Sequence, residues 1–118
     1  MRFQLDINYD AVFYHPELVY RENSPIYLEC ADKVYKVTGV YVSTVMLQSK
    51  ALFSHDWGCP YTGKDSLTFT GSLNPLHHAD VKVWRASVVD VAELLKHKLI
   101  QTVAYLSFFE SELIYLKD

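Results

Sequence analysis

Apolar and polar residues alternate at the start of the chain. Phe3, Leu5 and Ile7 share one face of an extended segment, and polar residues occupy the other face. This period of two is typical of a strand with one buried face. Segments rich in β-branched and aromatic residues predict further strands. These lie at 26–30, at 34–47 with a hairpin turn or a bulge at Gly39, at 67–70 and at 81–84.

The spacing of apolar residues changes to about 3.6 after the last of these strands. Ser87 is a favourable N-cap, and Asp90 three residues later forms an acidic variant of the capping box. The apolar stripe that follows contains Ala92, Leu95, Leu99, Thr102, Leu106, Phe109, Leu113 and Leu116. The spacing predicts one long amphipathic helix. The alternative is a helix that ends near Ser107, with a strand over 113–116.

These elements together predict an α+β fold. We expect an antiparallel sheet of about five strands, with one long C-terminal amphipathic helix packed on one face. The 118 residues are expected to form a single domain, 1–118, because this length with 50% hydrophobic residues can build one core. Leu95, Leu99 and Leu106 are expected to lie in that core.

Charge and cysteine content narrow the class of partner. The net charge is −3, and residues 1–32 alone carry a net charge of −4. We expect no nucleic-acid partner, because there is no basic stripe. We expect no membrane partner, because no apolar run approaches roughly 18–20 residues. Cys30 and Cys59 are expected to be reduced thiols, and the protein is expected to be cytoplasmic.

A glycine-rich loop at 54–65 carries the residues best suited to chemistry. Gly58 to Lys64 fits the first part of a phosphate-binding loop, but Asp65 stands where Ser or Thr should hold magnesium. A strand predicted at 67–70, where a phosphate-binding loop would open a helix, also argues against phosphate binding.

Four residues in or near this loop form a candidate metal set. They are His55, Cys59, His77 and His78. Sulfur and imidazole are ligands that zinc prefers, although this spacing is not typical of a closed zinc site. Cys59 would instead be a nucleophile if one of the histidines lay beside it.

Aromatic content favours recognition of another protein. The chain has nine Tyr, six Phe and two Trp, and Tyr and Trp are enriched at interface hot spots. The preferred hypothesis is a small protein-binding module of the inhibitor or immunity type, with no cofactor and no catalytic residue. Its acidic surface would steer association with a basic partner. The predicted partner-binding residues are Asp6, Asp10, Tyr14, Glu17, Tyr20, Trp57 and Tyr61.

Two other functions stay open. One is a small enzyme or metal-binding protein that uses the 54–65 loop with Cys59 and the three histidines. The other is a small-ligand module that holds an apolar molecule between sheet and helix.

The end of the chain also predicts self-association. Tyr105, Phe108 and Tyr115 lie off the apolar stripe, where a solvated helix would be polar. A homodimer through the C-terminal helix would cover them. The alternative is that residues 9–24 fold back over them.

Overall fold

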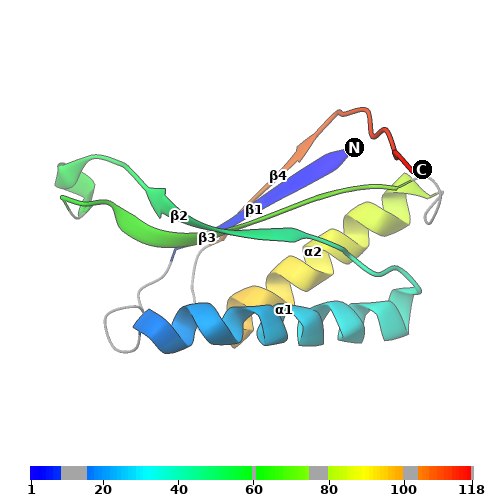
Figure 1. The fold of residues 1–118 in the computed structure, drawn as a ribbon, viewed down its shortest axis with the longest axis horizontal. Coiled ribbons are helices and arrows are strands. Elements are labelled where there is room, and N and C mark those ends of the chain that lie inside the picture. Colours follow the sequence, from blue (N-terminus) through cyan, green and yellow to red (C-terminus); the bar gives the residue numbers. More distant parts are fainter. Residues whose placement is uncertain (9–15, 60, 75–79, 100–103, 118) are drawn as a thin grey trace.

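The computed structural model describes residues 1–8, 16–59, 61–74, 80–99 and 104–117, with backbone only for 8 and 16–23. The described elements are β1 (Arg2–Asn8), α1 (Pro16–Thr38), β2 (Val45–Ala51), the 3-10 turn η2 (His55–Trp57), β3 (Lys64–Ser72), α2 (Val81–Lys98) and β4 (Ala104–Phe109). Both helices lie on the same side of the strands (Figure 1). The α+β class with an antiparallel sheet is confirmed.

The described strands form one antiparallel sheet in the order β2-β3-β1-β4. β1 is therefore central, and it pairs with two strands that are distant in sequence. Leu5 lies opposite Phe69 of β3 and opposite Leu106 of β4. The described sheet has four strands rather than about five, and the described residues form two helices rather than one long C-terminal helix.

The core lies between the sheet and the two helices. Phe3, Leu5 and Ile7 point toward the helices and are buried, as the alternation along β1 predicts. The α2 helix contributes Trp84, Val88, Val91 and Leu95, and the α1 helix contributes Tyr27, Cys30, Ala31 and Val34. Leu95 and Leu99 are buried as predicted, whereas Leu106 is half-buried and belongs to a strand.

The α1 helix corrects the prediction of strands at 26–30 and 34–47, because it extends to Thr38 and β2 begins only at Val45. Tyr27, Ala31 and Val34 recur at three- and four-residue steps and face the core. Pro25 lies inside the helix, where it cannot donate a backbone hydrogen bond. Packing of the buried face of α1 outweighs the loss of this hydrogen bond. The β-branched and aromatic residues that suggested strands form the apolar stripe of a helix instead.

The α2 helix begins earlier than predicted. Residues 81–84 form its first turn rather than a strand, because the Asp80 side chain accepts hydrogen bonds from the backbone N–H groups of Lys82 and Val83. Asp80 is therefore the N-cap. Ser87 is a buried interior residue whose hydroxyl donates to the Val83 carbonyl oxygen at 2.8 Å.

The α2 helix also ends earlier than predicted, at Lys98. Residues 104–109 form β4, in which half-buried and exposed side chains alternate. Leu106 and Phe109 are three residues apart, a spacing that fits a helical stripe as well, so the local pattern alone was misleading. The described residues 110–117 form neither helix nor strand, and the alternative strand at 113–116 is also absent there. Within the described part of the chain, no helix is long and apolar enough to cross a membrane.

Candidate functional site on the open face of the sheet

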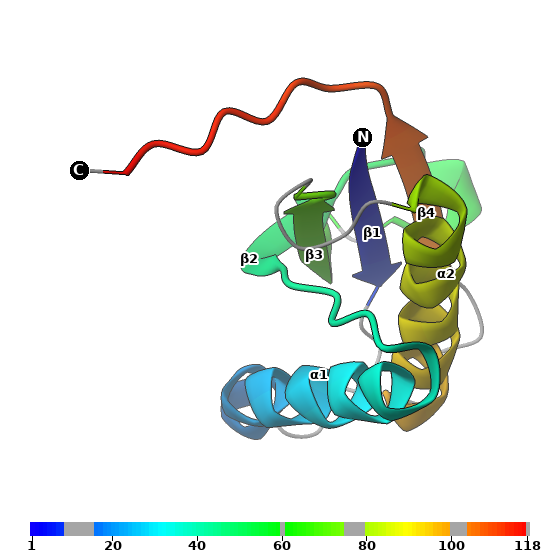
Figure 2. The same ribbon diagram turned by 90° about the vertical axis from the view of Figure 1, so that its right-hand side faces the viewer.

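The side of the sheet that faces away from α1 and α2 is not covered by either helix (Figure 2). Polar side chains project there from the two central strands, because they alternate with the core residues. Gln4 and Asp6 lie on β1, and Ser66 and Thr68 lie on β3. The register aligns Asp6 with Thr68 and with Tyr105 of β4.

These side chains form the floor of a groove that we call the outer-face groove. It has a volume of about 720 Å³ and extends from β4 across the sheet to the segment after β2. Its lining consists of Gln4, Asp6, Ser49, Lys50, Ala51, Leu52, Phe53, Trp57, Ser66, Thr68 and Tyr105. The volume is within the range of small-molecule sites in proteins.

A chain of hydrogen bonds holds the Asp6 carboxylate in place. The Thr68 hydroxyl donates to Oδ1 of Asp6 at 2.7 Å, and the Gln4 amide donates to Oδ2 at 3.0 Å. The Ser49 hydroxyl lies 2.9 Å from the Thr68 hydroxyl and donates to it, since the Thr68 proton is already used. Both oxygens of Asp6 are thus oriented, and each retains capacity to accept another hydrogen bond.

The charges and rings around Asp6 suit a cationic ligand. No described lysine or arginine forms an ion pair with Asp6, since Lys50 at the rim pairs with Asp65. Trp57 and Tyr105 line the same groove and are 80% and 61% exposed. Aromatic faces attract cations, so the groove combines a carboxylate with two π surfaces.

The structure places only some of the predicted partner-binding residues at this groove. Asp6 and Trp57 line it. Tyr61 lies on the β2–β3 connection, where it stacks on His55 with ring centroids 5.7 Å apart. Asp10 and Tyr14 lie outside the described residues, as do the side chains of Glu17 and Tyr20, although their backbone belongs to α1.

The predicted metal set is only partly described. The ring nitrogen Nδ1 of His55 lies 3.1 Å from the backbone carbonyl oxygen of Cys59. His55 therefore contacts the backbone of Cys59 and not its thiol. The Cys59 Sγ instead contacts the Phe53 N–H and the Ala51 carbonyl oxygen. His77 and His78 lie outside the described residues, and no group of three metal-ligating side chains occurs among the described ones. Participation of this set in metal binding or catalysis stays a prediction.

The predicted dimer surface does not lie on a helix, because residues 104–109 form β4 and residues 110–117 form neither helix nor strand. Tyr105 and Phe108 lie on β4 and point to opposite faces of the sheet. Phe108 packs against Trp84 with ring centroids 6.0 Å apart, and the Arg85 guanidinium lies over its ring. Tyr115 is exposed in the segment after β4. Phe108 thus packs against α2, while a dimer through Tyr105 and Tyr115 remains a prediction.

The sequence analysis missed most of the groove. Gln4, Ser49, Ser66 and Thr68 are polar positions of alternating strands, which was a visible signal. Their proximity depends on the strand order, which local pattern does not give.

Comparison with known proteins assigns a family. The family model described as SAM lyase matches residues 7–117, so this chain belongs to the SAM lyase family. No curated protein matches the chain significantly, and neither does any solved structure.

The family overturns the preferred hypothesis of a protein-binding module of the inhibitor or immunity type, and it favours the alternative of a small enzyme. The physical reason for the error lies in the chemistry. S-adenosylmethionine, or SAM, carries a sulfonium whose neutral thioether leaves readily. The acidic and aromatic residues that suggested a protein-binding surface are equally suited to a cationic small molecule.

Proposed function

We propose that this chain is a lyase that cleaves SAM, and that the outer-face groove binds the substrate. The observation that carries the proposal is the Asp6 carboxylate, which two hydrogen bonds orient and no described cation neutralises. The family assignment supplies the substrate class, and the groove supplies groups that match its charges.

The two cationic groups of SAM differ in what recognises them. The ammonium group has N–H donors, so it would pair with the Asp6 carboxylate through charge-assisted hydrogen bonds. The sulfonium has no hydrogen to donate, so aromatic faces such as Trp57 and Tyr105 suit it better. The carboxylate of SAM would compete with Asp65 for the Lys50 ammonium at the rim.

The same surroundings favour bond cleavage. When the carbon–sulfur bond to the amino-acid part of SAM breaks, its electron pair stays on sulfur and a neutral thioether leaves. The carboxylate oxygen of the same SAM molecule forms the new bond to that carbon and closes a lactone, so the positive charge of the sulfonium and the negative charge of the carboxylate disappear together. Water stabilises the charged substrate more than the transition state. Leu52, Phe53 and Trp57 would favour the reaction to the extent that their apolar surface displaces water from the sulfonium when SAM binds.

The test is a direct assay with a charge-removing variant. Purified protein is incubated with SAM, and the loss of SAM and the gain of its thioether product are followed by liquid chromatography. Asp6→Asn keeps the shape and removes the charge, so kcat/KM should fall by roughly 10- to 100-fold, corresponding to about 1.5–3 kcal/mol for hydrogen bonds to a charged group. Asp32→Asn removes the same charge from an exposed site on α1 and is the matched control.

Two results would overturn the proposal. Wild-type protein that leaves SAM intact would refute the activity. An Asp6→Asn variant as active as Asp32→Asn would refute the groove as the site while leaving the activity in place.

A further inference from the structure

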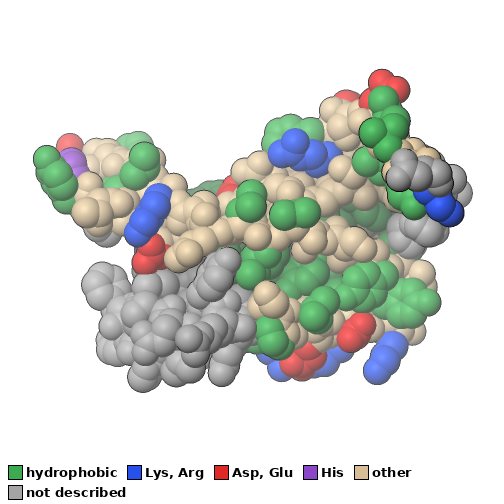
Figure 3. Space-filling view, viewed as in Figure 1, with side chains coloured by type: hydrophobic (Ala, Val, Ile, Leu, Met, Phe, Trp, Pro, Cys, Tyr) green, Lys and Arg blue, Asp and Glu red, His purple; other side chains and the backbone are tan. Residues whose placement is uncertain are grey.

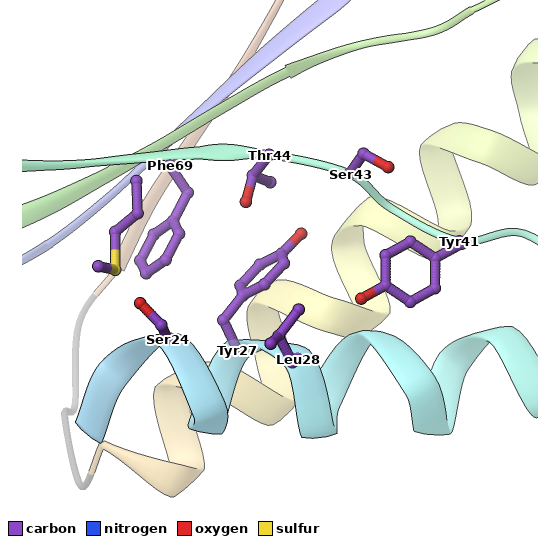
Figure 4. A pocket seen from close by; sticks show the side chains of 8 residues that line it. Ser24, Tyr27, Leu28, Tyr41, Ser43, Thr44 and Phe69 are labelled. Carbon is purple, nitrogen blue, oxygen red and sulfur yellow. The ribbon is translucent and has the colours of Figure 1, made fainter. Parts of the chain in front are cut away.

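A second pocket lies on the opposite side of the sheet from the outer-face groove. It has a volume of about 380 Å³ and is bounded by α1, by the segment 41–46 and by Phe69 of β3 (Figure 4). Figure 3 shows hydrophobic side chains gathered between the sheet and α1. Because β3 separates it from the groove, one small ligand cannot occupy both.

The inner wall of this pocket is aromatic and fixed. Tyr27 stacks on Phe69 with ring centroids 5.1 Å apart and an interplanar angle of 16°. The Tyr27 hydroxyl donates to the Val42 carbonyl oxygen at 2.6 Å. Burial raises the pKa of Tyr27 well above its usual range, so this wall stays uncharged. Tyr27 and Phe69 are almost completely buried against each other, so they form a rigid apolar floor for the pocket.

The outer part of the pocket adds hydroxyl groups and another ring. Tyr41 lines the pocket on the other side of Tyr27 from Phe69, and Ser24, Ser43 and Thr44 contribute hydroxyls (Figure 4). A hydroxyl both donates and accepts, so these groups can pair with the edge of a heterocycle or with sugar hydroxyls.

Among the side chains that the structure describes, none that lines the pocket is charged. An ion in the pocket would lack a partner among these side chains and would pay a desolvation penalty, so they discriminate against charged molecules. The volume is at the lower end of the range of about 300–1,000 Å³ for ligand sites, which suits one bicyclic ring with a sugar. The family assignment brings adenine nucleosides into the chemistry of this protein.

We propose that this pocket binds a neutral purine nucleoside, independently of the outer-face groove. The proposal rests on the shape and chemistry of the pocket and on the family, and not on where SAM is cleaved.

The first test measures binding by isothermal titration calorimetry with adenosine and with 5′-AMP as the probes. The two share base and sugar, and AMP adds a charged phosphate. Adenosine should bind at submillimolar concentration, and AMP should bind more weakly by about tenfold or more. Equal binding of the two, or no binding of adenosine, would overturn the proposal.

The second test fills the pocket. Ser24→Phe places a ring in it from an exposed helical position and should weaken adenosine binding by about tenfold or more. Lys36→Phe makes the same substitution at another exposed position of α1 and should leave binding unchanged. Tyr41→Leu removes one aromatic wall and serves as a second variant, with folding of all three checked by circular dichroism.

The assay of SAM cleavage separates this proposal from the proposed function. Ser24→Phe should lose adenosine binding and keep SAM cleavage, whereas Asp6→Asn should do the reverse. Loss of both functions in folded Ser24→Phe would place the substrate in this pocket and overturn the independence of the two sites. Unchanged adenosine binding in Ser24→Phe would overturn the pocket itself.

Discussion

The two faces of the sheet are built from the same strands and have opposite roles. On β1, Phe3, Leu5 and Ile7 face the helices and are at most 2% exposed, while Gln4 and Asp6 between them face the groove. The inner face stabilises the fold by burying apolar surface. The outer face carries little of that burial, so its side chains are available for binding and catalysis. A substitution should therefore affect stability on one face and activity on the other.

The largest effect on stability is expected in the core beneath the inner face. Leu95 of α2 is completely buried, so Leu95→Ala should lower the free energy of unfolding by about 2–5 kcal/mol. Denaturant titration measures the change, with Val89→Ala on the exposed side of the same helix as control. If the two variants lost equal stability, the assignment of Leu95 to the core would be wrong.

A smaller effect is expected where the chain passes close to the inner face. A methyl group at Gly71 would contact the Ser43 carbonyl oxygen and lie 2.7 Å from Phe3 Cε1. Gly71→Ala should therefore cost about 1–3 kcal/mol through overpacking. Ser72→Ala, one residue further along β3, is the control. A thermal midpoint for Gly71→Ala equal to that of Ser72→Ala would show that Phe3 and the 43–44 segment move aside freely.

On the outer face the effect should appear in activity. Thr68→Val keeps the shape and removes the hydroxyl that donates to Asp6. We expect KM for SAM to rise by roughly three- to tenfold, corresponding to about 0.5–1.5 kcal/mol. Thr70→Val changes the next outward-facing threonine of β3 and should leave KM unchanged. Equal kinetics for the two variants would show that orientation of Asp6 by Thr68 does not matter.

The smallest effect is expected at the ion pairs of Glu29, of which the one with Lys98 joins α1 to α2. The Oε1 atom of Glu29 lies 3.2 Å from the Nζ atom of Lys33 on the same helix and 3.2 Å from the Nζ atom of Lys98 on α2. The hydrogen bond with Lys98 lowers the pKa of Glu29 most, and the one with Lys33 lowers it further. A carboxylate with a lowered pKa in the folded state stabilises the fold above its unfolded pKa, and this contribution is lost as pH falls through the folded pKa.

Glu29→Gln should therefore be slightly less stable than wild type at pH 7, and this difference should disappear in acid. Chemical denaturation at both pH values measures it, and added salt should reduce it because the pairs are exposed. A difference that persisted in acid would have to come from packing rather than charge.

Several parts of the molecule were predictable because their pattern is unambiguous. Strict alternation at Phe3–Ile7 and at 67–70 fits only a half-buried strand, and both segments are strands. Asp6 and Trp57, which were predicted to bind a partner, both line the outer-face groove, and their role in binding stays a prediction. The groove around them was not predicted, since Gln4, Ser49 and Thr68 are ordinary polar residues of strands.

Other parts were ambiguous because one sequence fits two periods. In 104–109, Leu106 and Phe109 fit a helical stripe, yet Ala104, Leu106 and Phe108 also alternate as in a strand. Pairing with β1 selects the strand. In α1, Pro25 and the β-branched residues argued against a helix, and packing of Tyr27 and Val34 on the core outweighed them.

The sequence by itself determined which residues of each strand face the same way, because side chains alternate along any extended chain. Only the tertiary structure decided which strands are neighbours. Asp6 and Thr68 are 62 positions apart and come within 2.7 Å because β1 lies between β3 and β4. Strand order depends on how the apolar faces of α1, α2 and the sheet bury one another together. That is a property of the whole chain, which no local pattern contains.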